Sequence, residues 1–121
     1  MAEHNILGTK GEDLAKEFLI KNGYEILATN WHFRKVEVDI IATDGKEMVV
    51  VEVKTRTSNK FGEPEEFLSK QQQRNLVQAA NAYSEISHNP LDIRFDIVSI
   101  IYNNAEHRIY HIKDAFSAVG L

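Results

Sequence analysis

The stretch VEVDIIATDGKEMVVVEVKTR, residues 36–56, decides the fold, because it holds two strand-like segments joined by a turn signal. Residues 36–43 alternate between apolar and polar side chains before they become apolar, and residues 47–56 begin with an apolar run. Asp44-Gly45 between them is a strong signal for a two-residue hairpin turn. The apolar run indicates burial on both faces, so 47–56 is predicted to be a central strand.

The sequence on either side of this hairpin supplies helical and strand patterns in turn. Apolar residues recur at helical spacing before the hairpin, and aromatic and β-branched residues are concentrated in short segments on both sides. The expected elements are helices over 8–22 and about 66–87, and strands over 24–33, 36–43, 47–56, 92–101 and 107–112, followed by a short terminal helix or tail over 113–121. The order α-β-β-β-α-β-β predicts an α/β domain with a central mixed five-stranded sheet flanked by helices.

Length and composition restrict the possible classes of protein. The chain has 121 residues, 43% hydrophobic side chains and no Cys, which is typical of one globular domain spanning 1–121. The absence of Cys excludes disulfides, zinc-thiolate sites and thiol nucleophiles. The apolar runs are too short to span a membrane, and the first residues lack the pattern of a signal peptide. We therefore expect a cytoplasmic protein with no membrane partner.

The charge balance constrains any nucleic-acid function. The formal net charge is -4, whereas proteins that bind nucleic acid usually carry a basic field. Residues 34–74 hold eight basic and eight acidic residues, so this charged middle region is mixed and not basic. A nucleic-acid partner would therefore have to be recognised by local charge.

Two adjacent strands carry charged residues where strands usually carry apolar ones. Glu37 and Asp39 are two residues apart and so are predicted to share one face of their strand, as are Glu52 and Lys54. With a two-residue turn, Glu37 lies opposite Glu52, and Asp39 lies diagonal to it. All four side chains are then expected on the same face of the sheet. A loop one residue longer would break this parity.

Carboxylates this close together repel one another unless they take up protons or share a cation. A site that offers only oxygen ligands favours a hard ion such as Mg²⁺ or Mn²⁺. Such an ion polarises a phosphoryl oxygen and lowers the pKa of a bound water, and Lys54 alongside can stabilise developing charge or orient that water. This combination points to metal-assisted hydrolysis of phosphodiesters.

Each candidate also has a simpler interpretation. A Glu-x-Lys pair such as Glu52 and Lys54 is commonly a solvated surface ion pair. Glu12 borders the apolar stripe of the first helix, but an acid in a first helical turn is also common because it suits the helix dipole. The possible phosphate contacts are more often plain surface charges; they are Arg34, Lys35, Arg56 and Lys70. His107 and His111 share a face of one predicted strand, but no acid completes a site near them, so they are interpreted as structural residues.

Beyond these patterns, the chain resembles a known family. Asp39 followed by Glu52-Val53-Lys54 resembles the Asp…(Asp/Glu)-x-Lys signature of the restriction-endonuclease-like nuclease superfamily, and the whole chain is similar to one bacterial branch of it, the uncharacterised YraN family. The matching stretches are Gly8-x-x-Gly11-Glu12, Ala15, Gly23-Tyr24-x-Ile26, Asn30-Trp31, Glu37-Val38-Asp39-Ile40-Ile41, Val51-Glu52-Val53-Lys54-x-Arg56, Phe61-Gly62-x-Pro64, Lys70, Arg94-Phe95-Asp96 and Ala115-Phe116.

The resemblance implies a restriction-endonuclease-like fold and a role for each matching residue. It implies Asp39 and Glu52 as metal ligands and Lys54 as the catalytic lysine. By similarity to archaeal Holliday-junction resolvases, Glu12 is implied as a further carboxylate ligand. Glu37 matches the family's Gly-Glu-Ile-Asp element, in which Val36 here replaces the Gly.

Together these observations predict a Mg²⁺- or Mn²⁺-dependent endonuclease that hydrolyses DNA, with branched or damaged DNA as candidate substrates. A small domain with one site would cut both strands of a duplex most simply as a homodimer. The alternative is a catalytically inactive module on a nuclease scaffold that binds nucleic acid or protein. A weaker alternative is a purely structural domain whose carboxylates are solvated.

Overall fold

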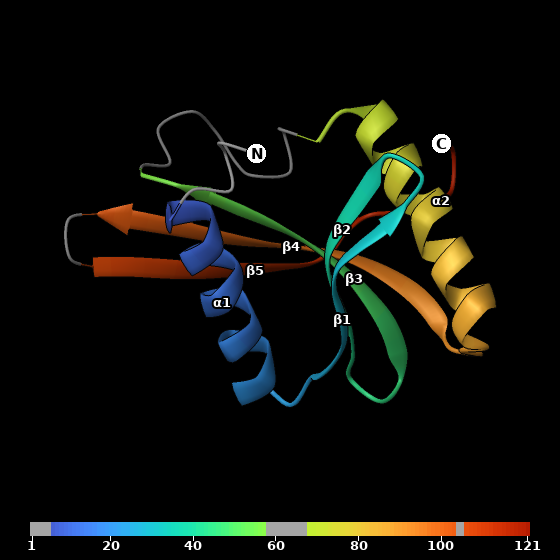
Figure 1. Cartoon of the computed structure of the whole chain (residues 1–121), viewed down its shortest axis with the longest axis horizontal. Coiled ribbons are helices and arrows are strands. Elements are labelled where there is room, and N and C mark those ends of the chain that lie inside the picture. Colours follow the sequence, from blue (N-terminus) through green and yellow to red (C-terminus); the bar gives the residue numbers. More distant parts are fainter. Residues whose placement is uncertain (1–5, 58–67, 104–105) are drawn as a thin grey trace.

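The computed structural model describes residues 6–57, 68–103 and 106–121, and it has the predicted order of elements (Figure 1). Two helices flank a five-stranded sheet, so the protein is an α/β domain with the expected sequence α-β-β-β-α-β-β. The elements are α1 (Ile6–Lys21), β1 (Glu25–Phe33), β2 (Val36–Thr43), β3 (Glu47–Arg56), α2 (Lys70–Ser87), β4 (Asp92–Asn103) and β5 (Glu106–Phe116).

The sheet is mixed, and its strands follow the order of the chain. The spatial order is β1-β2-β3-β4-β5, in which β3 and β4 are parallel and the other neighbouring pairs are antiparallel. A parallel pair requires a crossover connection, and α2 supplies it between β3 and β4. The predicted central position of residues 47–56 is confirmed, because β3 has β2 on one side and β4 on the other.

The two faces of the sheet carry separate apolar cores. Val49 and Val51 of β3 face α1, whereas Met48 and Val50 face α2, as strand alternation requires. The core beneath α1 also contains Ala15, Leu19, Tyr24, Ile40, Ala42, Val98 and Ile100, and the core beneath α2 contains Val38, Ile41, Leu76, Ala79, Ala80 and Phe95. The helices therefore lie on opposite faces and hold the central strands between them.

The hairpin between β2 and β3 is wider than the predicted two-residue turn. Thr43 pairs with Met48, so four residues lie between the last paired residues, and the Asp44 carboxylate accepts hydrogen bonds from the backbone N–H groups of Lys46 and Glu47. The predicted register was therefore wrong. The error arises because Asp44 can close a turn through its side chain as well as through a tight backbone turn.

A second irregularity affects the alternation of side chains in β1 and β2. Val38 and Ile41 both pack beneath α2 although they are three residues apart, and so do Ala28 and Trp31 of β1. In β2 the alternation breaks between Val38 and Ile40, which pack in different cores, and in β1 it breaks near Asn30, which has a left-handed backbone with φ 48°. The pairing of the two strands shifts register earlier in β1, between Ile26 and Ala28. The simple alternation used to place Glu37 and Asp39 thus does not hold through the break in β2.

Several boundaries also differ from the expected ones. β5 runs to Phe116, so the expected terminal helix or tail was wrong over 113–116; Phe116 pairs with Phe95, and their rings stack 4.8 Å apart. α2 begins at Lys70 after a capping box formed by Ser69 and Gln72, whereas the predicted start at 66 lies outside the described residues. Within the described ranges, neither helix has the length and apolarity needed to cross a membrane.

Candidate functional site

Helix α1 approaches β3 closely at Gly11, and this contact brings Glu12 to the sheet. A Cβ atom at Gly11 would lie 2.0 Å from Oγ1 and 3.1 Å from Cβ of Thr55, so any side chain there would require the Thr55 side chain or the helix to shift. Glu12 follows directly and is partly buried. The glycine therefore sets the distance between the helix and the strand that carries Glu52 and Lys54.

Asn30 links two of the predicted acids. Its Nδ2 donates hydrogen bonds to Oε1 of Glu12 at 3.1 Å and to Oε2 of Glu37 at 2.8 Å. Oε1 of Glu37 also lies 3.7 Å from Nε2 of His32. Asn30 was not predicted as a site residue; its only signal was its place in the Asn30-Trp31 stretch shared with the similar family.

Asp39 lies where β2 and β3 separate. Its Oδ2 accepts a hydrogen bond of 2.8 Å from the backbone N–H of Val53, beyond the last paired residues Ile40 and Val51. Partial burial is the main cause that raises the pKa of Asp39 to about 8, and the nearby charges of Glu52, Glu12 and Glu37 add to the rise. Asp39 also lines a cavity of about 310 Å³ together with Glu12, Lys16, Asn30 and Glu37.

Glu52 and Lys54 form an ion pair on the adjacent strand. Nζ of Lys54 lies 3.6 Å from Oε2 of Glu52, and the two side chains are 20% and 19% exposed. Burial raises the pKa of Glu52, Lys54 opposes that rise, and Glu12 and Glu37 add to it. Glu52 lines a second cavity of about 150 Å³, which it shares with Glu37.

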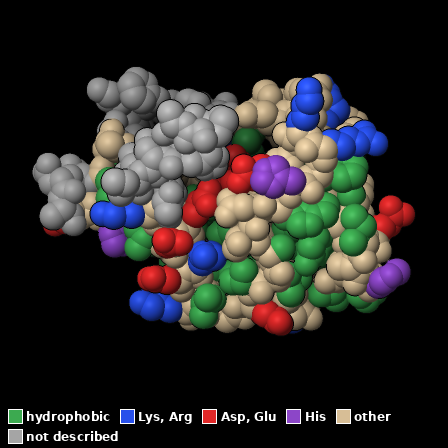
Figure 2. Space-filling model, in the orientation of Figure 1, with side chains coloured by type: hydrophobic (Ala, Val, Ile, Leu, Met, Phe, Trp, Pro, Cys, Tyr) green, Lys and Arg blue, Asp and Glu red, His purple; other side chains and the backbone are tan. Residues whose placement is uncertain are grey.

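The predicted acids thus meet, but not through a common sheet face as expected. Glu12, Glu37 and Asp39 line the cavity beside α1, whereas Glu37 and Glu52 line the cavity beside α2. Among the described residues, no three His, Asp or Glu side chains form a group able to hold a metal ion in the observed conformation. Figure 2 shows acidic side chains gathered next to a His near the middle of one face of the molecule.

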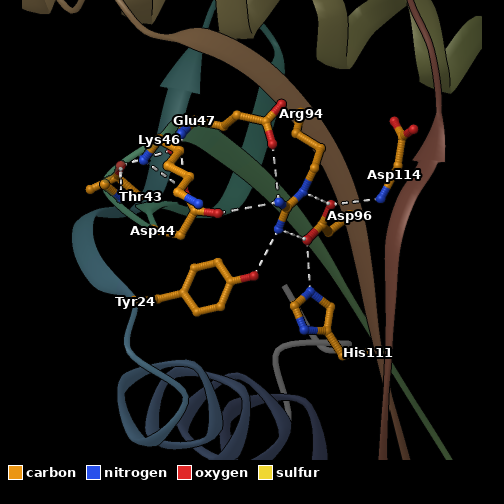
Figure 3. A network of polar contacts seen from close by, with 10 residues as sticks. Tyr24, Thr43, Asp44, Lys46, Glu47, Arg94, Asp96, His111 and Asp114 are labelled. Carbon is orange, nitrogen blue, oxygen red and sulfur yellow. Dashed lines mark hydrogen bonds and ion pairs between the residues drawn. The ribbon is translucent and has the colours of Figure 1, made fainter.

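A second polar cluster lies on the sheet face covered by α1 and is centred on the buried Asp96 (Figure 3). Arg94 donates two hydrogen bonds to its carboxylate at 2.9 and 2.8 Å, and His111 Nε2 lies 2.7 Å from Oδ2. The backbone N–H of Asp114 donates a further bond, and Arg94 also donates to the hydroxyl of Tyr24.

These contacts decide the charge of Asp96. Burial alone would raise the pKa of Asp96, but the hydrogen bonds from His111, Arg94 and the Asp114 backbone outweigh it and hold the pKa below its usual value. The expectation that no acid lies near His111 was wrong, because Asp96 is fifteen residues away in sequence yet adjacent across the β4–β5 pair.

Comparison with known proteins places the chain among bacterial relatives. A model described as uncharacterised protein family UPF0102 matches residues 11–100. The chain is 49% identical over 116 residues to a UPF0102 protein of Christiangramia forsetii, covering 96% of this chain and 98% of that one. It is 50% identical over 116 residues to a UPF0102 protein of Flavobacterium psychrophilum, with the same coverage, and 43% identical over 118 residues to one of Parabacteroides distasonis, covering 98% of each chain.

Proposed function

The chain belongs to the uncharacterised protein family UPF0102, and we propose that it is a metal-dependent nuclease that hydrolyses phosphodiester bonds in DNA. The observation that carries this proposal is the unbalanced negative charge around Asp39. Its carboxylate accepts a backbone hydrogen bond from Val53, whereas Glu52, Glu12 and Glu37 all raise its pKa. A cation would relieve this repulsion.

The ligand types at the site suit a hard divalent ion. Asp39 and Glu52 would hold Mg²⁺ or Mn²⁺ through carboxylate oxygens, with Glu12 as a further candidate ligand. Mg²⁺ is commonly bound by one or two carboxylates and keeps several waters, so a ready-made cage of three protein ligands is not required. When bound, such an ion polarises a phosphoryl oxygen and lowers the pKa of a coordinated water.

The chain's own residues would supply positioning and charge. Lys54 already lies beside Glu52 and carries an ammonium group that can stabilise negative charge developing on a phosphate. Asn30 holds Glu12 and Glu37 in a fixed arrangement through its two donated hydrogen bonds. Glu37 lines both cavities and so would lie at the centre of a substrate path that connects them.

A binding module without turnover is the second candidate, and one observation favours it. The described residues contain no ready group of three metal ligands, and Lys54 is engaged by Glu52. Such a module would bind DNA through the same surface without cleaving it, with or without a divalent ion. Measurement of binding and cleavage in parallel distinguishes the two candidates.

The test is cleavage of linear, nicked and four-way DNA with Mg²⁺, Mn²⁺ or chelator. We expect cleavage only with a divalent ion, and loss of cleavage in Asp39→Ala and Lys54→Ala. Asp92→Asn, an exposed acid at the start of β4, is the matched control and should cut normally. Cleavage that survives both site substitutions would contradict the proposal.

We also propose that cutting both strands of a duplex uses a homodimer, because one small site contacts one strand at a time. Light scattering after size exclusion, with and without a duplex, measures this directly. A monomer on intact duplex that still cuts both strands would contradict it.

A further inference from the structure

Folding places several of the described charged residues of 34–74 on two neighbouring surfaces. The acidic members Glu37, Asp39 and Glu52 line the two cavities of the candidate site. The basic members on the β1–β2 turn and the first half of α2 are instead exposed; they are Arg34, Lys35, Lys70 and Arg74, and we call them the basic surface. This separation could not be read from the sequence, in which bases and acids are equal in number over this stretch.

The β1–β2 turn places two bases beside the site. Arg34 has a left-handed backbone with φ 58°, and its guanidinium carbon lies 5.0 Å from the centre of the Phe33 ring. Stacking on an aromatic ring restricts the guanidinium while leaving its N–H groups available to a ligand. Lys35 lines the same cavity as Glu37 and Glu52, so the basic surface is continuous with the candidate site.

Helix α2 extends this surface away from the site. Lys70 and Arg74 are one helical turn apart, and α2 contains no acid before Glu85. Continuing the same helical row gives Gln78 and Asn81, which line a groove of about 450 Å³ together with Phe33, Arg34 and, at its far end, Glu85. Figure 2 shows Lys and Arg side chains gathered over the first half of α2 and the β1–β2 turn, next to the acidic group.

We propose that the basic surface binds the phosphodiester backbone of the DNA strand whose scissile phosphate lies at the acidic site; this inference rests on the proposed function. The whole chain has a net charge of -4, so attraction for a polyanion must come from a local surface of this kind. Exposed Lys and Arg residues that contact phosphates release counterions, which makes binding strongly dependent on salt. The amide donors of Gln78 and Asn81 can add hydrogen bonds to phosphate oxygens along the same row.

The test measures DNA affinity by fluorescence anisotropy in the Asp39→Asn background, so that cleavage does not interfere. The pairs Arg34→Gln/Lys35→Gln and Lys70→Gln/Arg74→Gln each remove two positive charges from the basic surface. Arg108→Gln/Lys113→Gln on β5 removes two exposed charges elsewhere and is the matched control. We expect roughly tenfold or greater weakening for each surface pair, with a fall of about 2 in the slope of log K against log salt, and less than about twofold weakening for the control.

The outcomes separate this inference from the proposed function. Equal weakening by all three pairs, or normal binding by both surface pairs, would overturn the basic surface as the DNA contact, even if wild-type protein cleaves DNA. Weakening by the surface pairs alone, in a protein that never cleaves with any divalent ion, would support the inference as a DNA-binding surface while overturning the nuclease. Absence of DNA binding by every form would overturn both.

Discussion

Asp39 and Asp96 are two aspartates on neighbouring parts of one sheet, and their surroundings are opposite. Asp96 is fully buried and receives hydrogen bonds from Arg94, His111 and the Asp114 backbone, which hold its pKa below the usual value. Asp39 is partly buried among acids, and its pKa is raised to about 8. A buried carboxylate with matched donors and cations belongs to the folded framework. One surrounded by like charges needs a proton or a ligand from outside the chain.

The largest contrast is expected in catalysis. Asp39→Asn keeps an oxygen that can accept the Val53 hydrogen bond but removes the charge that would hold the ion. We expect single-turnover cleavage to fall by about 10³-fold or more, which is about 4 kcal/mol of barrier. Under conditions in which the Asp96→Asn variant is folded, its cleavage rate should differ from that of wild type by less than about tenfold. Cleavage by Asp39→Asn within tenfold of wild type would remove Asp39 from the site.

The next contrast is in stability, where we expect the substitution at Asp96, and not the one at Asp39, to have the larger cost. Asp96→Asn leaves the guanidinium of Arg94, whose side chain is 12% exposed, without its fully buried charged partner, so that Asp44 and Glu47 remain as its ion pairs. We expect the free energy of unfolding to fall by about 3 kcal/mol in urea titrations. Asp92→Asn serves as the exposed control and should change it by less than about 0.5 kcal/mol. An Asp96→Asn protein as stable as wild type would show that this cluster contributes little to the fold.

The position of α1 tests whether the site depends on close packing. Gly11→Ala places a Cβ against Thr55, so the Thr55 side chain or the helix must shift, and a shift of the helix would carry Glu12 away from β3. We expect a loss of about 2 kcal/mol in stability and about tenfold in cleavage. Combining it with Thr55→Ala, which removes the Oγ1 that the new Cβ would meet, should restore part of both losses. Normal cleavage by Gly11→Ala would mean that the placement of Glu12 is not critical.

The smallest effect is expected in the pH dependence of stability without metal. The pKa of Asp39 rises from 3.8 to about 8 on folding, so the folded state holds a proton that the unfolded state lacks between these values. Stability from this group is therefore present below about pH 4 and is lost progressively as the pH rises toward 8. Asp39→Asn should flatten this decline in the free energy of unfolding, and Mg²⁺ should stabilise wild type more at pH 8 than at pH 6.

The pKa of Asp96 is lowered, so the stability that Asp96 contributes is lost in acid instead. A wild-type profile that matches Asp39→Asn throughout would refute this account.

Part of the fold and of the candidate site could be predicted from the sequence. Residues 36–56 alone predicted the central hairpin, and the charges of Glu37, Asp39, Glu52 and Lys54 on apolar strands marked the candidate site. The register could not be predicted, because the side chain of Asp44 closes a wider turn that the residue types do not distinguish from a tight one.

The long-range contacts could not be predicted either. Arg94 reaches the hydroxyl of Tyr24, seventy positions earlier in the chain, only because strands from both halves share one sheet. Asn30 bridges Glu12 and Glu37 because β1 changes its backbone direction at that residue. Neither contact leaves a periodic signal in the sequence.

The parallel pairing of β3 with β4 has a consequence for synthesis on the ribosome. Every proposed ligand lies before residue 55, so the nascent chain completes the hairpin and its acids well before β4 is made. Until then, the β4-facing edge of the apolar strand Glu47–Arg56 has no partner and can pair with other chains. Co-translational folding of this protein thus contains an interval of aggregation risk that ends when Asp92–Asn103 emerges and docks.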